Sequence, residues 1–360
     1  MDKPKETPRG SESEDKRDAD DLSKERQSSS EVLIEQFLAD SGRGSPREPA
    51  GEAAPDWDEA PLPEGHKSGF VALIGRPNVG KSTLLNRLVG EKVAIVSSKP
   101  QTTRNRLRGI LTEPDYQIVF VDTPGIHQKP PHRINEIMIK DAVAAIPDAD
   151  VILFVVDVAV YPRSEDAYIA DLLRAHAGAS PVIFTLNKVD RLDLARAEAR
   201  IKAFWALLPD YADSMPVSAL EGTNVDALLD HILMHLPEGP RYYPGGQITD
   251  QAERQIAAEL IREALFRYTH QEIPHSAAVL VEDYHSQENG VFRVGARIWV
   301  DRPSQKPIVI GRQGQKLKQI GIAARRELER FIGGQVFLDL WVKVKPGWRD
   351  DMARLRELGH

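Results

Sequence analysis

From Phe70 onward, short apolar runs alternate with longer stretches of helical periodicity, which is typical of a mainly parallel sheet covered by helices. The apolar runs predict strands at Phe70–Gly75, Leu107–Thr112, Gln117–Asp122, Val151–Asp157, Val182–Asn187 and Met215–Val217. The amphipathic stretches predict helices at Lys81–Val89, Arg133–Ile146, Ala167–Ala175, Leu194–Leu207 and Val225–Leu236. Asn224 is the predicted N-cap of the last helix, and Pro237 its stop signal. Residues 67–238 are therefore expected to form a doubly wound, mostly parallel α/β domain.

A second pattern begins after a stretch rich in proline and glycine, Glu238 to Gln247, which marks a linker over residues 239–249. It predicts a helix, two strands, a helical pair broken by glycines, and a last strand. The ranges are Asp250–Thr269, Ala277–Tyr284, Val291–Val300, Ile308–Ile332 and Val336–Lys345. The order αββααβ indicates a separate α+β domain over residues 250–349, followed by a tail at residues 350–360.

The first 66 residues differ from the rest in composition. They are rich in Ser, Pro, Glu and Asp, with Phe37 and Trp57 as their aromatic side chains. Too little apolar surface is present to offset the entropy of the chain, so we predict an acidic, disordered extension. The stretch Val32–Leu38 permits a short amphipathic helix that docks on a partner, or a transient helix without function.

The net charge of -7 over 360 residues hides an asymmetry. Residues 1–66 carry 18 acidic and 9 basic side chains, whereas Asp250 to Arg349 carry 16 Lys and Arg against 12 Asp and Glu. A mildly basic C-terminal half is compatible with nucleic acid or with an ordinary solvated helical face. The chain has no cysteine, which excludes disulfides and thiolate metal sites, and it has no apolar run long enough for a membrane span. A cytoplasmic protein is expected.

The eight residues from Gly75 to Ser82, GRPNVGKS, lie between a predicted strand and a predicted helix, where a P-loop belongs. Consecutive backbone N–H groups and a helix N-terminus form a positive concavity for phosphates, and the glycines allow close approach. Lys81 is expected to reach the β- and γ-phosphates, and Ser82 to offer its hydroxyl to Mg²⁺. The predicted phosphate-binding residues are Gly75, Arg76, Pro77, Asn78, Val79, Gly80, Lys81, Ser82 and Thr83.

The sequence Asp122-Thr123-Pro124-Gly125 ends a predicted strand downstream of the P-loop. Alone it would be an Asp-initiated turn. After a P-loop it predicts that Asp122 holds the metal and that the Gly125 amide contacts the γ-phosphate.

The sequence Asn187-Lys188-Val189-Asp190 follows another apolar run, at the sheet edge where open α/β sheets bind ligands. The Asp190 carboxylate can accept hydrogen bonds from the ring N–H and the amine of guanine, a donor pair that adenine lacks. Ser218-Ala219, after the last strand, offers the Ala219 amide to the guanine carbonyl. GTP and GDP are therefore the expected ligands.

In the second domain, Ile308 to Lys316 contain a GxxG sequence from Gly311 to Gly314, flanked by an apolar run and a basic helix start. Seven basic and two acidic residues lie between Lys306 and Arg330. A helix-breaking turn would explain the glycines alone, but the αββααβ order favours an RNA-binding loop. The expected RNA-binding residues are Ile308, Ile310, Gly311, Arg312, Gln313, Gly314, Lys316 and Lys318. For the two isoleucines, lining an apolar groove and core packing both remain open.

GRPNVGKS, DTPG, NKVD and SAL, in this order and followed by an αββααβ segment with GxxG, resemble the Era family of GTPases, whose second domain is a type II KH domain. The resemblance covers the chain after residue 66. It implies a bacterial factor that binds the 3′ end of 16S ribosomal RNA, acts on the immature 30S subunit as a monomer, and associates peripherally with the membrane. It also places the first switch at Gln101–Arg104, where Thr103, with Thr102 as competitor, completes the Mg²⁺ shell.

Ile126 occupies the position at which Ras-like enzymes carry the glutamine that orients the attacking water. Slow hydrolysis is therefore expected, supported by Lys81, Thr103 and Gly125. In similar GTPases a K⁺ ion contributes, and Asn78 is its candidate ligand here, unless Asn78 only caps its own turn. Arg76 and Arg104 are unassigned electrostatic candidates. A nucleotide-holding RNA scaffold without turnover is the alternative function, and a sister-family GTPase acting on the ribosome or tRNA is a third.

Overall fold

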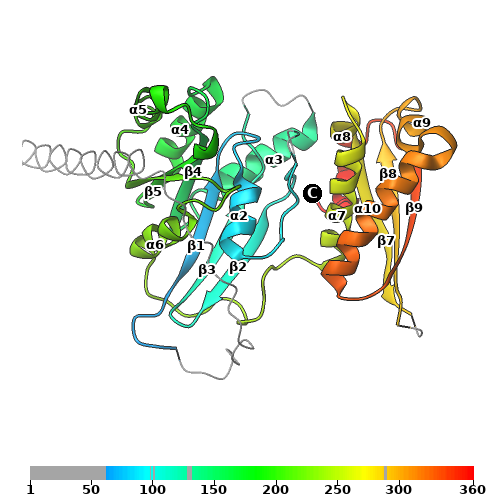
Figure 1. Ribbon diagram of the computed structural model, residues 1–360, viewed down its shortest axis with the longest axis horizontal. Coiled ribbons are helices and arrows are strands. Elements are labelled where there is room, and N and C mark those ends of the chain that lie inside the picture. The colour runs from blue at the N-terminus through cyan, green and yellow to red at the C-terminus, as the bar shows by residue number, and fades with distance from the viewer. Residues whose placement is uncertain (1–61, 98, 100–101, 128–131, 288–289) are drawn as a thin grey trace, which may run out of the picture.

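The computed structural model describes residues 62–97, 99, 102–127, 132–287 and 290–360. The predicted disorder of residues 1–66 lies, up to residue 61, outside this range. The same is true of the amphipathic stretch Val32–Leu38 and of Gln101 in the predicted switch. Two domains follow one another along the chain, each with its own sheet and core (Figure 1).

The first domain is built on a six-stranded sheet with the order β2-β3-β1-β4-β5-β6. The strands are β1 (Lys67–Ile74), β2 (Leu107–Glu113), β3 (Tyr116–Asp122), β4 (Val151–Asp157), β5 (Val182–Asn187) and β6 (Asp213–Val217). All neighbours pair in parallel except β2, which runs antiparallel to β3 at the edge. Every residue of β4 is buried, as expected for a strand covered on both faces.

Helices cover both faces of this sheet. α2 (Lys81–Val89) and α6 (Val225–His235) pack on the face that includes Leu73, while α3 (Arg133–Ala144), α4 (Ser164–His176) and α5 (Ala197–Trp205) lie towards the face that includes Ile74. The predicted doubly wound fold is confirmed. Asn224 is the N-cap residue of α6, as predicted, but its side chain makes no capping bond: it donates to the Pro216 carbonyl at 2.9 Å, and its backbone is left-handed with φ 57°.

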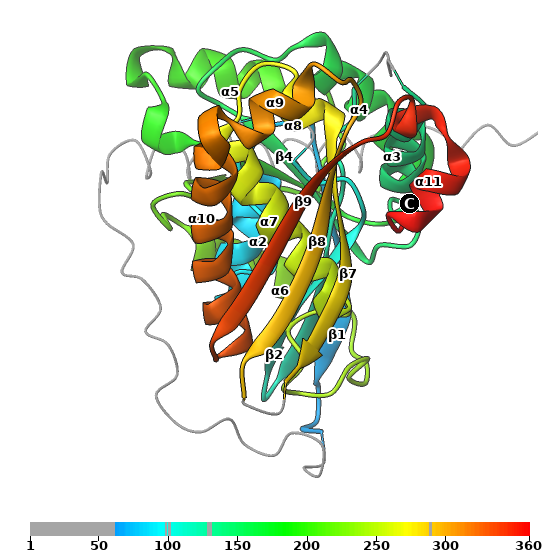
Figure 2. The same cartoon turned by 90° about the vertical axis from the view of Figure 1, so that its right-hand side faces the viewer.

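The second domain has a three-stranded sheet with the order β7-β8-β9, in which β7 and β8 are antiparallel and β8 and β9 parallel. Its elements are α7 (Glu253–Tyr268), the short α8 (Ile273–Ser276), β7 (Ala277–Ser286), β8 (Phe292–Val300), α9 (Gln305–Ile310), α10 (Gln315–Ile332) and β9 (Val336–Val344). Figure 2 shows the three strands side by side, with α7 and α10 next to them. The predicted αββααβ order is confirmed, with α8 as an addition.

The segment predicted as a linker runs past the first residues of β1 and β3 and reaches the edge strand β2. Thr249 bridges Gly109 of β2, and the Ser68 hydroxyl donates to the Pro240 carbonyl at 2.6 Å. The side chain of Gln117 accepts from the amides of Tyr242 and Tyr243 at 2.7 and 3.0 Å. These bonds fix the path of the chain between the domains.

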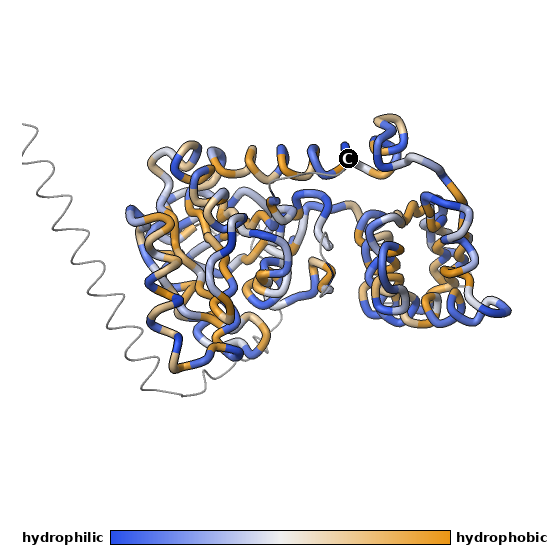
Figure 3. The backbone as a smooth tube through the Cα atoms, turned by 90° about the horizontal axis from the view of Figure 1, so that it is seen from above, coloured by the Kyte–Doolittle hydropathy of each residue, from blue (hydrophilic) through white to orange (hydrophobic). Residues whose placement is uncertain are grey.

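The end of the chain packs between the two domains (Figures 1 and 3). Residues 350–360, predicted as a tail, include helix α11 (Met352–Glu357). Leu355 of this helix joins an apolar cluster with Ile134 and Met138 of α3 and with Trp299 and Trp348 of the second domain. In the described part of the chain, no helix combines the length and apolar character needed to cross a membrane.

Candidate functional site

The P-loop connects β1 to α2 and holds its lysine inside the protein. Lys81 is 6 % exposed, and its Nζ donates to the carbonyls of Gly75 at 2.9 Å and Arg76 at 3.1 Å. Burial lowers the pKa of Lys81 to about 8, although Asp122 opposes this shift. A phosphate group bound here would stabilise the charged form of this buried lysine.

The two P-loop glycines are required for close packing within the protein. A Cβ on Gly75 would meet the carbonyl oxygen of Val155, and one on Gly80, where φ is +104°, would meet the side-chain amide of Asn187. We predicted that these glycines serve close phosphate approach. The structure adds that they also let the P-loop lie directly against β4 and the end of β5.

Three oxygen atoms converge next to Lys81. The Ser82 hydroxyl lies 2.6 Å from Oδ2 of Asp122 and 2.8 Å from the Thr103 hydroxyl, which lies 3.2 Å from the same Oδ2. The Thr102 hydroxyl instead donates to the Lys99 carbonyl at 2.7 Å, so the geometry favours Thr103 as the metal ligand. Asp122 is fully buried, which raises its pKa, and its Oδ1 has no hydrogen-bond partner among the described residues. Hydroxyl and carboxylate oxygens in this arrangement fit Mg²⁺, which supplies positive charge when bound.

Gly125 lies against the P-loop. A Cβ at this position would stand 2.6 Å from the backbone nitrogen of Pro77. The following amide, that of Ile126, donates to the Gly75 carbonyl at 3.3 Å. The segment after Asp122 therefore contacts the P-loop at Gly75 and Pro77, and no side chain fits at Gly125.

Replacing Gly125 with Ala is expected to lower the GTP hydrolysis rate by about 100-fold, because one γ-phosphate donor is displaced. The affinity for GDP should change by less than about threefold, since GDP lacks the γ-phosphate. Single-turnover hydrolysis and titration with fluorescent GDP measure the two quantities. Equal losses of both would show that the glycine supports the P-loop alone.

The residues expected to bind guanine are placed at the carboxyl ends of β5 and β6. Asp190 accepts from the Ser218 hydroxyl at 2.6 Å, which orients the carboxylate. Asn187 donates to the Val79 carbonyl at 2.7 Å and accepts from the Ala219 amide at 3.0 Å, so this amide, predicted to reach guanine, is bonded within the protein. Lys188 donates to the Asn78 carbonyl at 2.6 Å. The loop that begins at Asn187 is thus joined to the P-loop by hydrogen bonds.

The Arg76 side chain has a structural role that its position in the motif does not reveal. Its Nε donates to Asp166 of α4 at 3.2 Å, and Asp166 is fully buried. Its Nη2 lies 3.8 Å from Asp157, which also pairs with Lys188 at 2.7 Å. The prediction of Arg76 as an electrostatic candidate for phosphate is not supported, and Asp157 and Asp166 were missed because nothing in the sequence near the P-loop indicates them.

A cavity beside the P-loop gathers most of the predicted phosphate and metal residues. Its lining consists of Pro77, Asn78, Gly80, Lys81, Ser82, Thr83, Ile95, Val96, Ser97, Thr102, Thr103 and Gly125. Val79 is not one of these lining residues, and its side chain is buried in the core. The hydroxyl of Thr123 donates to the Leu73 carbonyl at 2.7 Å and supports β3 instead of facing the cavity.

The GxxG loop projects from the second domain between α9 and α10. Gly311 and Gly314 have φ of +73° and +76°, and Gln313 between them has +51°. A Cβ on Gly311 would stand 2.6 Å from that of Lys316. The side chains of Arg312, Gln313 and Lys318 reach the surface, so the loop presents backbone and charge to solvent.

A groove runs from this loop along α10 and β9. It is lined by Gly314, Leu317, Lys318, Gly321, Ile322, Arg325, Val336, Phe337, Leu338 and Leu340. Neither isoleucine predicted for it is among these residues: Ile310 packs against the core, and Ile308 is 43 % exposed. Leu317 and Ile322 lie on α10, whose amphipathic periodicity could have indicated them.

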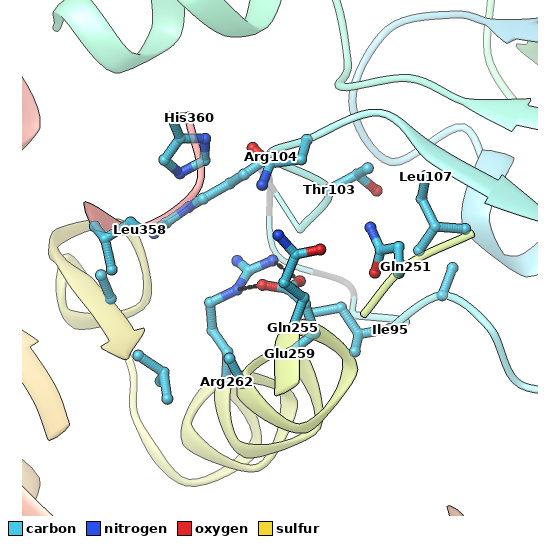
Figure 4. A pocket seen from close by; sticks show the side chains of 15 residues that line it. Ile95, Thr103, Arg104, Leu107, Gln251, Gln255, Glu259, Arg262, Leu358 and His360 are labelled. Atoms are coloured by element: carbon cyan, nitrogen blue, oxygen red, sulfur yellow. Dashed lines mark hydrogen bonds and ion pairs between the residues drawn. The ribbon is translucent and has the colours of Figure 1, made fainter. Parts of the chain in front are cut away.

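The switch residues around Thr103 connect the two sites. The carbonyl of Thr102 accepts from Arg262 of α7, and the Arg104 guanidinium donates to the Pro274 carbonyl at 3.3 Å and stacks over Trp348 at 5.4 Å. Figure 4 shows Thr103, Arg104 and Arg262 around the cavity between the domains. Both neighbours of the candidate metal ligand are therefore anchored in the second domain.

The chain has, in this order, a strand, a phosphate-binding loop, an aspartate at a site that fits Mg²⁺, and a loop suited to guanine. This order defines a P-loop GTPase. The family model "50S ribosome-binding GTPase" matches residues 70–188, and the model "KH domain" matches residues 272–349. The GTPase Era of Leuconostoc citreum is 46% identical over 294 residues, covering 82% of this chain and 96% of the relative. That of Caldanaerobacter subterraneus is 49% identical over 296 residues, covering 82% and 98%.

Solved structures agree with these relatives. A crystal structure of Era with MgGDPNP and nucleotides 1506–1542 of 16S ribosomal RNA is 39% identical, with a TM-score of 0.77, covering 81% of this chain and 98% of that chain. A variant of Aquifex aeolicus Era bound to GDP and AlF4⁻ has the same identity and TM-score. The chain belongs to the Era family of GTPases. It binds GTP and GDP with Mg²⁺ and hydrolyses GTP.

Proposed function

We propose that this protein is a GTP-controlled RNA-binding switch that binds 16S ribosomal RNA near its 3′ end and assists assembly of the 30S subunit. The observation that carries the proposal is the pair of anchors on either side of Thr103. A residue that is placed to ligate Mg²⁺ with its hydroxyl lies between a carbonyl held by Arg262 and a guanidinium held by Pro274. A movement of Thr103 on metal binding therefore acts, through its two neighbours, on the domain that carries the GxxG loop.

The contacts between residues 92–99, which precede the switch, and the second domain are polar and charged. Lys92 pairs with Glu263 at 2.6 Å and with Glu327 at 3.0 Å, and the amide of Val96 donates to Glu263 at 3.2 Å. Lys99 donates to the carbonyls of Phe266 and Thr269 at the end of α7. Hydrogen bonds of this kind exchange with water at modest cost, so the interface can open and reform as the switch residues move.

RNA recognition is proposed for the second domain. The GxxG loop supplies backbone N–H groups and basic side chains for phosphates, and the groove beside it supplies apolar surface for unstacked bases. The related Era complex contains nucleotides 1506–1542 of 16S ribosomal RNA, and we extend this target to the present chain. Activity on 30S particles in the cytoplasm, with peripheral association with the membrane, completes the proposal.

Hydrolysis is proposed to depend on positioning. Lys81 and the P-loop amides bind the phosphates, while Gly125 directs its backbone to the γ-phosphate. Ser82, Asp122 and Thr103 are the proposed ligands of Mg²⁺, which lowers the charge on the leaving phosphates when bound. Asn78 has φ +64° and lines the same cavity, and a contribution of K⁺ at this residue remains a prediction.

Replacing Arg312 and Lys316 together with Ala is expected to weaken binding of an RNA fragment from the 16S 3′ end by about 30-fold and to reduce the salt slope by about 2, because two phosphate contacts are lost. GTP affinity should stay unchanged, since the loop lies in the other domain. Filter binding at several salt concentrations gives both quantities. The double variant Arg174→Ala, Arg196→Ala removes the same charge from exposed positions of the first domain and serves as the control. Equal RNA affinity of wild type and GxxG variant would refute the proposed RNA site.

A further inference from the structure

Ile126, which stands in the place of the water-orienting glutamine, has no side-chain atom that can orient water. Ile126 is 0 % exposed, and its side chain belongs to the apolar core beneath α3 and α4. Its amide donates to the Gly75 carbonyl at 3.3 Å, and the same carbonyl accepts from Lys81 Nζ at 2.9 Å. The Gly75 carbonyl therefore links the backbone of Ile126 to Lys81, the lysine that binds the phosphates.

The residue after Ile126 is a histidine that the motifs do not use. His127 is partly buried, and its Nε2 is shielded from solvent without a hydrogen-bond partner among the described residues. An unpaired buried ring nitrogen destabilises a fold, so its presence calls for a functional explanation. The charged groups that act on the ring are Glu165 at the start of α4 and Lys81 of the P-loop.

The other basic side chains near the site are engaged elsewhere. Arg76 pairs with buried Asp166 at 3.2 Å, and Arg104 is 6 % exposed with its guanidinium directed into the second domain. Lys188 bridges Asn78 and Asp157. The Nη2 of Arg76 also has no hydrogen-bond partner among the described residues, but it lies 3.8 Å from Asp157, whereas the His127 ring directly follows the Gly125–Ile126 turn.

We propose that His127 is a catalytic residue that accepts a hydrogen bond from the attacking water and orients it towards the γ-phosphorus. The water oxygen forms a bond to this phosphorus as the bond to the oxygen that bridges to the β-phosphate breaks. GDP leaves, and the proton of the water passes to the released phosphate, so the imidazole carries no net proton away. The proposal rests on the GTPase activity of the family and specifies which side chain of this chain serves it.

A neutral imidazole is required for this role. Burial lowers the pKa of His127 from its ordinary value of 6.5, Glu165 opposes the shift, and Lys81 adds to it. The ring is therefore uncharged at neutral pH and becomes protonated only below its usual range. Hydrolysis should fall as the pH drops through this lowered pKa, because the protonated ring cannot accept from water.

The test is His127→Ala in the full chain with Mg²⁺, K⁺ and the 16S fragment present. The rate of single-turnover hydrolysis should fall about 100-fold, while the GTP affinity stays within about twofold of wild type. His127→Gln should retain part of the rate and lose the acid limb of the pH profile. His176→Ala, an exposed histidine at the end of α4, is the matched control and should leave the rate unchanged.

A second readout does not depend on turnover. Binding of AlF4⁻ to the Mg²⁺–GDP complex, followed by fluorescence of a labelled GDP, should weaken about 10-fold in His127→Ala, because this anion mimics the transferring phosphoryl group and its water. A variant that hydrolyses GTP at a rate close to that of wild type would overturn the proposal. So would equal loss of GDP binding and rate, which would assign His127 a structural role. A wild type without turnover would count against the GTPase function itself, which is a different outcome.

Discussion

Replacing Asp190 with Asn is expected to weaken GTP binding by about 100-fold and to reverse the base preference towards xanthosine triphosphate. The carboxylate can accept from both the ring N–H and the amine of guanine, and the bond from Ser218 at 2.6 Å holds it in place. An asparagine amide accepts one of these bonds and presents a donor to the other, which matches the carbonyl of xanthine. Competition between the two nucleotides for a fluorescent analogue measures the change.

The control for this variant is Asp193→Asn, three residues further along the chain. The Asp193 side chain accepts from the Ala195 amide at 3.2 Å and starts a short helical turn. The control removes the same charge from the same loop, at a residue that is not expected to contact guanine. Base preference should be unaltered. If Asp190→Asn also keeps its preference for guanine, the assignment of the base site is wrong.

Replacing Lys81 with Ala is expected to lower the hydrolysis rate by about 1000-fold and to weaken GTP binding strongly, because the main cation at the β- and γ-phosphates is lost. Thermal stability without nucleotide should not fall. Burial disfavours the charged form of Lys81, as its pKa of about 8 shows, so the ammonium destabilises the nucleotide-free protein. A melting temperature that is not lowered, combined with loss of turnover, is the expected result.

This combination separates a functional residue from a structural one. Lys202→Ala, an exposed lysine that pairs with Glu198 at 2.8 Å on α5, is the control and should alter neither quantity. Differential scanning fluorimetry with and without GTP follows the stability. A Lys81→Ala protein that unfolds at a clearly lower temperature without nucleotide would contradict the account of the buried ammonium.

The sequence predicted those features that consecutive residues build. The P-loop follows from a strand, eight residues and a helix start, so its physics is local, and the apolar runs predict the strands because a sheet buried on both faces needs them. The GxxG loop is likewise local. Its positive φ values at Gly311 and Gly314 are what glycine permits.

Contacts between distant segments could not be predicted in this way. Arg76 meets Asp166 across 90 residues, and Arg262 meets Thr102 across 160. Neither pair has a local pattern, since each depends on how two helices come to lie against a loop. The isoleucines before GxxG were assigned to the groove or the core because both are apolar, yet Ile308 is exposed at the surface of α9. The side of a short helix that faces solvent is set by packing, which the sequence alone does not define.

The contacts between the residues around Thr103 and the second domain are the basis on which we propose that the GTPase acts as a timer. The Thr103 hydroxyl lies against Ser82 and Asp122, while its neighbours Thr102 and Arg104 are bonded to Arg262 and to the Pro274 carbonyl. A state with bound GTP and Mg²⁺ should favour one arrangement of the second domain, and loss of the γ-phosphate should release it. Thermodynamic linkage then requires that RNA and GTP raise each other's affinity by the same factor.

The affinity of the 16S 3′ fragment for the protein with Mg²⁺ and a non-hydrolysable GTP analogue, compared with that for the protein with GDP, tests this central claim most directly. We predict binding at least about fivefold tighter with the analogue, and RNA should raise the affinity for the analogue relative to that for GDP by the same factor. Equal RNA affinity in the two nucleotide states would contradict the account.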